Sequence, residues 1–137
     1  MGLLSGKPPD NLGITDGRLA ACRSSPNCVS SQADLATDLG HYIDPIRFRG
    51  PAQVAWKALV ETVRHSERVH IVREEDGYLH ATFTSRLMGF VDDTEFQLDR
   101  NDGVIHVRSA ARLGHSDLGV NRKRVEAIRA KLAAVGV

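Results

Sequence analysis

Polar side chains gather near one end of the strands that the sequence predicts. Asp92 shares the strand parity of Phe96 and is expected on the apolar face of the sheet, where a carboxylate needs a hydrogen-bonding partner. The segment 111–117 leaves the last strand at the same end and leads to a helix amino terminus, which favours anions. We therefore expect a rim site for a small, anionic ligand, with candidate binding residues Arg86, Asp92, Ser109, Arg112, His115, Ser116, Asn121 and Arg122.

The favoured function is a non-enzymatic ligand-binding or accessory domain, because the sequence holds no P-loop, dinucleotide-binding or nucleophile-elbow motif. One alternative is an enzyme of unknown class that uses Asp92, His115 or Cys28. Another is a purely structural interaction module, in which Asp92 accepts bonds from Arg112 or loop amides and locks the last helix to the sheet. A pocket that joins Arg86, Asp92 and Arg112 would favour binding or catalysis, whereas a filled, fully bonded cluster would favour the structural module.

The two cysteines, Cys22 and Cys28, flank a turn signal at Pro26-Asn27. One alternative is a disulfide, which requires an oxidising compartment, and the other is a pair of reduced thiols. The C-x5-C spacing alone does not match a zinc site.

Three histidines, His70, His80 and His106, share one face of the predicted sheet. The expected register places His80 beside Gln97, whose other neighbour is His106, so the two imidazoles lie two strands or roughly 9–10 Å apart. That separation is wide for joint metal ligation. We therefore expect no metal and no cofactor, and a solvated sheet face.

Composition bounds the class of protein. The chain has 137 residues, of which 26% are charged and 42% hydrophobic, as in a single globular domain with a core. A net charge of +1 and 5% aromatic residues give no support for a nucleic-acid partner. No run approaches the ~18 apolar residues of a membrane span. Met1–Asp10 lacks the apolar region of a secretory signal, so the cytoplasm is the default location, and a periplasmic or lumenal one would follow if the cysteines are bridged.

The hydrophobic pattern predicts an α+β fold, with a four-stranded antiparallel sheet and two helices on one of its faces. A short edge strand within Pro45–Phe48 would make five strands. Residues 1–50 are expected to form an irregular arm packed on the core, with a disordered tail as the competing interpretation of the first ten residues. Residues 51–137 form the α+β domain, in the order α-β-β-β-β-α.

The expected elements follow from periodicity and from turn residues. The first helix begins at Pro51 and buries Trp56, and the last covers Leu118–Ala134 with Ser116 or Asp117 as its N-cap. The four expected strands are Glu67–Arg73, Tyr78–Leu87, Phe90–Asp99 and Val104–Ala110.

Turn lengths set the expected register of these strands. A three-residue loop, Glu75–Gly77, places Val69 and Ile71 on the face of the apolar residues of the next strand. A two-residue loop, Met88-Gly89, sets Phe83 opposite Thr94. The other expected pairs are Leu87 with Phe90, Leu79 with Leu98, Ser85 with Asp92, Phe96 with Val107, Leu98 with Ile105, Thr94 with Ser109, and Glu95 with Arg108.

Four ordered motifs, NLGITDGRLAAC, SSPNCVSSQA, SRLMGFVDDTEF and VRSAARLGHSDLGVNRKRVEAIR, resemble a family known as domain of unknown function, family 1499. The resemblance extends from about Asn11 to Ile128, and Arg23 replaces a proline that is frequent in the family. It implies no established activity, substrate or cofactor. The family motifs are matched at seven polar positions of the rim, Ser85, Asp92, Ser109, Arg112, Ser116, Asp117 and Asn121.

Overall fold

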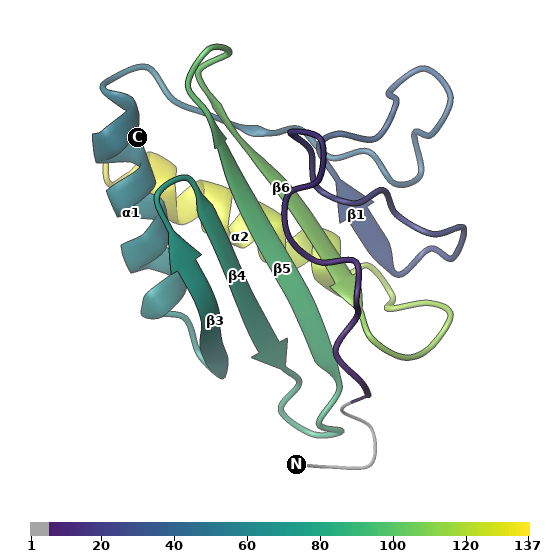
Figure 1. Cartoon of the computed structure of the whole chain (residues 1–137). Coiled ribbons are helices and arrows are strands. Elements are labelled where there is room, and N and C mark those ends of the chain that lie inside the picture. The colour runs from purple at the N-terminus through teal and green to yellow at the C-terminus, as the bar shows by residue number, and fades with distance from the viewer. Residues whose placement is uncertain (1–5) are drawn as a thin grey trace.

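A six-stranded antiparallel sheet carries the fold, and two helices lie behind it in the view of Figure 1. The computed structural model describes residues 6–137. The expected α+β class is confirmed, with more strands than expected. The elements are β1 (Cys28–Ser30), β2 (Ile46–Arg47), α1 (Ala52–Arg64), β3 (Val69–Glu75), β4 (Tyr78–Thr84), β5 (Val91–Asp99), β6 (Val104–Ala111) and α2 (Val120–Ala134).

The strand order is β1-β6-β5-β4-β3, and β2 pairs with β6 beside β1. Both arm strands therefore extend the same edge of β6, where Val29 lies opposite Ser109 and Ile46 opposite Ile105. The expected edge strand within Pro45–Phe48 is β2. The additional strand β1 has only three residues, too few for an alternating pattern to stand out in the sequence.

The core lies between the sheet and the helices. Helix α1 follows Pro51, whose fixed φ suits a helix start, and buries Trp56 and Leu59 on one side. Helix α2 turns Val125 and Leu132 toward the same core. The buried cluster is completed by apolar residues of the sheet, among them Leu79, Ala81, Phe83, Phe96, Ile105 and Val107.

The start of α2 differs from the expected one. Gly119, with a φ of 80°, occupies the N-cap position instead of Ser116 or Asp117. The carboxylate of Asp117 still accepts hydrogen bonds from the backbone N–H groups of Gly119 at 2.9 Å and Asn121 at 3.0 Å. The side chain of Asp117 thus caps the helix, although Asp117 lies two residues before the N-cap position. It reaches the helix end because the left-handed conformation of Gly119 folds the chain back over it.

The β3–β4 turn has two residues, Asp76-Gly77, instead of the expected three, and Glu75 pairs with Tyr78. This shorter turn alone would move the apolar residues of β3 to the wrong face. An irregularity between Ile71 and Arg73 adds one residue to β3 and restores the expected facing, with Ile71 opposite Ala81.

The β4–β5 connection is longer than expected, and the predicted register of these strands is wrong by two residues. Phe83 lies opposite Asp92 instead of Thr94. The expected pairing of Ser85 with Asp92 is also wrong, because Ser85 donates its N–H to the carbonyl of Phe90 at 2.7 Å and closes a wide loop. A shift of two residues leaves every side chain on its expected face, so hydrophobic alternation alone could not reveal it.

The expected β5–β6 register is confirmed. Phe96 lies opposite Val107, and Leu98 opposite Ile105. The polar pairs Thr94 with Ser109 and Glu95 with Arg108 also stand as expected.

The second face of the sheet was expected to be solvated, and it is not. His80, Asp93, Glu95 and Arg108 are all buried on it. The arm crosses in front of β5 and β6, drawn in purple in Figure 1, and its backbone satisfies part of this polar face. Glu95 accepts a hydrogen bond from the N–H of Gly13 at 2.7 Å, for example. The competing interpretation of the first ten residues as a disordered tail lies partly outside the described residues, which begin at residue 6.

Candidate functional site

Asp92 points toward the helices as expected, but its partner is not Arg112. Its carboxylate lies 2.8 Å from Nη1 of Arg124 on α2. Arg112 follows β6 with the strand parity of Arg108 and so faces the opposite side of the sheet. Burial raises the pKa of Asp92, and the charge of Arg124 opposes that effect only in part.

A filled polar cluster surrounds Asp92 and connects the sheet to α2. Thr94, Ser109 and Asn121 are fully buried there. The hydroxyls of Thr94 and Ser109 lie 2.7 Å apart, and Ser109 donates to Oδ1 of Asn121. Asn121 in turn donates from Nδ2 to Asp117 at 2.8 Å and accepts from Arg124 at 3.0 Å. These bonds are those of a structural latch between β5, β6 and α2.

The remaining rim residues do not converge on this cluster. Arg86 and His115 are exposed in separate loops. Ser116 accepts a hydrogen bond from the N–H of Leu118, and Arg122 donates to the carbonyl of Gly40. A pocket of about 250 Å³ does open at the rim, but most of its lining is apolar: Ser85, Phe90, Asp92, Ala111, Leu113, Gly114, Ser116, Asp117, Leu118 and Val120.

The residues considered for catalysis are also kept apart. Cys28 is bonded to Cys22 in a disulfide with a Cα–Cα distance of 5.8 Å, so its sulfur is not a thiol nucleophile. Asp92 lines the rim pocket, whereas Cys28 lines a different pocket on the other face of the sheet. His115 lines neither of these two pockets.

The three histidines have separate surroundings. The ring of His80 lies 2.7 Å from a carboxylate oxygen of Asp93, and His106 contacts the hydroxyl of Ser31 at 3.0 Å. His70 is exposed. Among residues 6–137, no group of three or more His, Cys, Asp or Glu side chains is arranged to hold a metal ion.

The strongest candidate site lies between the arm and the outer face of the sheet, a face on which we did not expect a pocket from the sequence. Its volume is about 340 Å³. Four cations line it, Lys7, Arg23, Arg108 and Arg112, with a single carboxylate, that of Asp93. We call it the arm pocket, and its other lining residues are Pro9, Asn11, Ser25, Asn27, Cys28, Ala110, Ala111 and Gly114.

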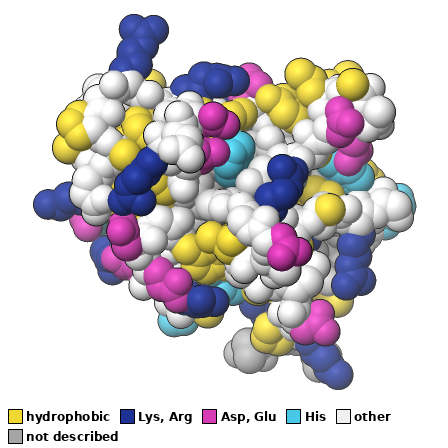
Figure 2. Space-filling model, turned by 45° about the horizontal axis from the view of Figure 1, so that its top comes forward, with side chains coloured by type: hydrophobic (Ala, Val, Ile, Leu, Met, Phe, Trp, Pro, Cys, Tyr) yellow, Lys and Arg dark blue, Asp and Glu magenta, His cyan; other side chains and the backbone are white. Residues whose placement is uncertain are grey.

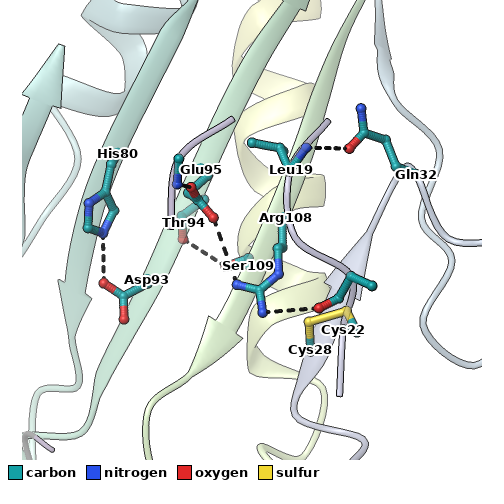
Figure 3. A network of polar contacts seen from close by, with 12 residues as sticks. Leu19, Cys22, Cys28, Gln32, His80, Asp93, Thr94, Glu95, Arg108 and Ser109 are labelled. Carbon is teal, nitrogen blue, oxygen red and sulfur yellow. Dashed lines mark hydrogen bonds and ion pairs between the residues drawn. A yellow bond between two sulfur atoms is a disulfide. The ribbon is translucent and has the colours of Figure 1, made fainter. Parts of the chain in front are cut away.

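Arg108 is the most deeply placed of these cations, with 5% of its surface exposed. As Figure 3 shows, its guanidinium lies between Glu95 and the arm. Nη1 is 3.8 Å from Glu95, and Nη2 donates to the carbonyl of Ala21 at 3.5 Å, so both contacts are long. Nε has no hydrogen-bond partner in the part of the chain that the structure describes. Burial lowers the pKa of Arg108.

Asp93 is engaged by protein groups. It accepts two hydrogen bonds from Arg112, at 2.8 and 3.0 Å. It also contacts His80, as Figure 3 shows. Burial alone would raise the pKa of Asp93, but the hydrogen bonds from His80 and Arg112 outweigh it and hold the pKa below its usual value. Because Asp93 forms an ion pair with Arg112, its negative charge does not neutralise the other cations of the arm pocket.

Lys7 and Arg23 have no carboxylate within 4 Å among the described residues, so the arm pocket carries excess positive charge. The excess is local. On the face drawn in Figure 2, Lys and Arg side chains stand singly among acidic and uncharged ones and form no continuous basic surface.

Of the predicted ligand-binding residues, only Arg112 lines the arm pocket, and Cys28, predicted as a disulfide or catalytic residue, lines it as well. Lys7, Arg23, Asp93 and Arg108 were missed as site residues. One signal was present in the sequence: Asp93, Arg108 and Arg112 share a strand parity. Nothing in the local pattern indicated that the arm would cover that face.

Across residues 6–137, the structure contains no helix that is both long and apolar enough to cross a membrane. No curated protein and no solved structure matches the chain. A family model does match, over residues 18–132, and its description is "Protein of unknown function (DUF1499)". The chain therefore belongs to the DUF1499 family, whose resemblance was already visible in the ordered motifs of the sequence.

Proposed function

We propose that this domain binds a small anionic molecule in the arm pocket and acts as a non-enzymatic binding or accessory module. The observation that carries the proposal is the excess positive charge of the arm pocket, which Lys7 and Arg23 line without an ion-pair partner among the described residues, next to the buried Arg108. Cations that no carboxylate matches gain from a ligand of opposite charge, because hydrogen bonds between ionised groups are stronger than those between neutral groups.

The chemistry of the lining favours a carboxylate or a phosphate as the binding group. A guanidinium offers a planar set of N–H donors that matches the oxygens of both anions. Lys7 and Arg23 add positive charge at the pocket edge, where they attract an anion from solution.

The size of the arm pocket restricts the ligand. Its volume of about 340 Å³ lies near the lower end of small-molecule sites. An inorganic anion, a small organic acid or a phosphorylated metabolite fits this volume better than a polymer does.

Binding is favoured over catalysis because the reactive groups at the pocket are already occupied. Cys28 is in a disulfide, and the Asp93 carboxylate is held by Arg112 and His80. The disulfide also supports location in an oxidising compartment, periplasmic or lumenal, because such bonds persist there.

Thermal unfolding in the presence of inorganic phosphate, sulfate and citrate tests the proposal. A ligand that binds only the folded chain raises the melting temperature as its concentration exceeds the dissociation constant. We expect at least one of these anions to raise it, and isothermal titration calorimetry to give one site per chain. Arg23→Gln should weaken this binding roughly tenfold, since it removes one unpaired charge next to the ligand.

The matched control is Arg47→Gln. Arg47 is exposed on β2 and pairs with Val104 at the other end of β6, so the change removes the same charge away from the arm pocket. Equal loss of affinity in both variants would indicate nonspecific screening. That result, or no response to any of the three anions, would overturn the proposed site.

A further inference from the structure

A second feature, independent of the arm pocket, is a group of apolar side chains exposed at one end of the sheet. Leu87 is 90% exposed and Leu118 is 85% exposed. Isolated exposed leucines are common on protein surfaces, but contiguous ones mark interaction sites. We call this group the apolar tip, and it comprises Leu87, Met88, Phe90, Leu113, Leu118 and Val120.

Two loops far apart in the sequence build the apolar tip. One connects β4 to β5, at the lower end of the sheet in Figure 1, and the other connects β6 to α2. They are neighbours in space, because Phe90 from the first loop and Leu113, Leu118 and Val120 from the second line the rim pocket of about 250 Å³. The recess therefore joins the two loops, and Leu87 and Met88 belong to the first loop, within three residues of Phe90.

Unpaired cations border this surface. Arg86 precedes Leu87 in the first loop, and Lys123 lies near Val120 at the edge of a neighbouring groove. Neither has an ion-pair partner in the described part of the chain. Of the two nearby carboxylates, Asp92 is paired with Arg124, and Asp117 accepts hydrogen bonds from the start of α2 but keeps its charge. The three cations Arg86, Lys123 and Arg124 thus outnumber the two carboxylates, and the border of the tip carries net positive charge.

We propose that the apolar tip docks on the surface of a bilayer that contains anionic lipid. Leu87, Met88 and Leu118 would enter the boundary between headgroups and acyl chains, while Arg86 and Lys123 contact lipid phosphates. Apolar side chains bordered by Lys and Arg bind such surfaces by burial and charge attraction together. The same charges oppose docking of two tips in a dimer, because like charges would meet around the interface.

Co-sedimentation of the full chain with vesicles tests this inference. We expect the protein to pellet with vesicles of equal parts phosphatidylglycerol and phosphatidylcholine, and to remain in solution with phosphatidylcholine alone. Raising the salt should release it, because attraction between exposed charges is screened. Leu87→Asp and Leu118→Asp should each lower partitioning roughly tenfold or more, since each puts a charge in place of an apolar side chain that would enter the bilayer.

The matched control is Val54→Asp. Val54 is 60% exposed in the first turn of α1, beside Gln53, which accepts a hydrogen bond from Arg100 at the β5–β6 turn. That turn lies at the opposite end of the sheet from the tip (Figure 1). The control variant should bind vesicles like the unchanged protein. All three positions are exposed, so we expect the variants to fold, as circular dichroism would verify.

Three results would overturn the inference. The first is failure of the unchanged protein to bind the anionic vesicles. The second is equal loss of binding in Leu87→Asp and Val54→Asp. The third is a dimer in analytical ultracentrifugation that Leu118→Asp dissociates, which would assign the tip to a second copy of the chain.

Discussion

Asp93 accepts both hydrogen bonds of a two-point ion pair from Arg112, with Nε at 2.8 Å from one carboxylate oxygen and Nη2 at 3.0 Å from the other. Its neighbour in sequence, Asp92, pairs with Arg124 on the opposite face of the sheet. Two adjacent carboxylates on β5 thus hold two different elements, the loop after β6 on one side and α2 on the other. This arrangement follows from strand geometry, in which successive side chains alternate between faces.

The first prediction concerns which pairs are coupled. Asp93→Asn and Arg112→Ala should each destabilise the protein by about 3–5 kcal/mol, because each leaves a largely buried charge without its partner. In urea unfolding, the double variant should lose much less free energy of unfolding than the sum of the losses in the two single variants. The comparison pair is Asp92→Asn with Arg112→Ala, whose effects should add. Coupling in the comparison pair and additivity in the first would contradict the structure.

The register of the sheet shows where sequence reasoning is reliable. Strand faces were predicted correctly, because a polar residue on the apolar face is costly and alternation is therefore enforced. The β4–β5 register was predicted wrongly. Phe83 lies opposite Asp92 and not opposite Thr94, but both registers put the same residues on the same faces of the sheet. Only the length of the loop separates the two registers, and the Met88-Gly89 turn signal indicated a tighter loop than the one that forms.

The candidate site was harder to predict, because the pocket forms only where the arm covers the outer face of the sheet. Glu95 and Arg108 alternate with apolar residues just as surface residues do, and a covering segment with few apolar side chains leaves no local signature. The arm satisfies the buried carboxylate of Glu95 through the backbone N–H of Gly13, and a backbone donor is available in almost every residue. The sequence led us to expect an arm packed on the core, but it did not indicate which face of the sheet the arm would cover.

The second prediction concerns pH. The pKa of Asp93 lies below its usual value, although burial alone would raise it, because hydrogen bonds from His80 and Arg112 outweigh burial. The folded protein therefore keeps Asp93 ionised at a pH where the unfolded chain binds a proton. The resulting stabilisation is complete above the ordinary Asp pKa of 3.8 and is lost as the pH falls through the folded-state pKa. Near neutral pH, Asp93→Asn should be the less stable protein, and the difference should shrink below about pH 4.

Asp92→Asn provides the internal control for that measurement, because burial raises the pKa of Asp92. The stability contributed by this group is present below the ordinary Asp pKa of 3.8 and declines as the pH rises through the folded-state pKa. Urea midpoints over a pH series should therefore show opposite slopes for the two variants relative to the unchanged protein. Parallel slopes would contradict the assignment of their partners.

The third prediction concerns the attachment of the arm to the sheet. Glu95 is fully buried and accepts hydrogen bonds from the N–H of Gly13 and from the hydroxyl of Tyr78. Glu95→Ala removes the oxygen that accepts both hydrogen bonds, so hydrogen exchange of the amides around Gly13 should accelerate at least about tenfold while the amides of α2 change little. Glu67→Ala, at an exposed position, is the control and should leave the arm unchanged. Equal acceleration in the arm and α2 would mean that Glu95 supports global stability and does not fix the arm.

The last prediction concerns the disulfide between Cys22 and Cys28, which closes a loop that contains Arg23 and two other residues of the arm pocket, Ser25 and Asn27. Reduction should lower the free energy of unfolding by about 2–3 kcal/mol, because the reduced unfolded chain gains conformational entropy. It should also weaken anion binding, since these pocket residues are no longer fixed beside β1. The variant with Cys22→Ser and Cys28→Ala should behave like the reduced protein and should not respond to reductant. The starting protein must be shown by its mass to be oxidised. If its melting temperature and its affinity for anions are the same with and without reductant, the disulfide does not order the pocket. The arm is then held only by its hydrogen bonds to the sheet.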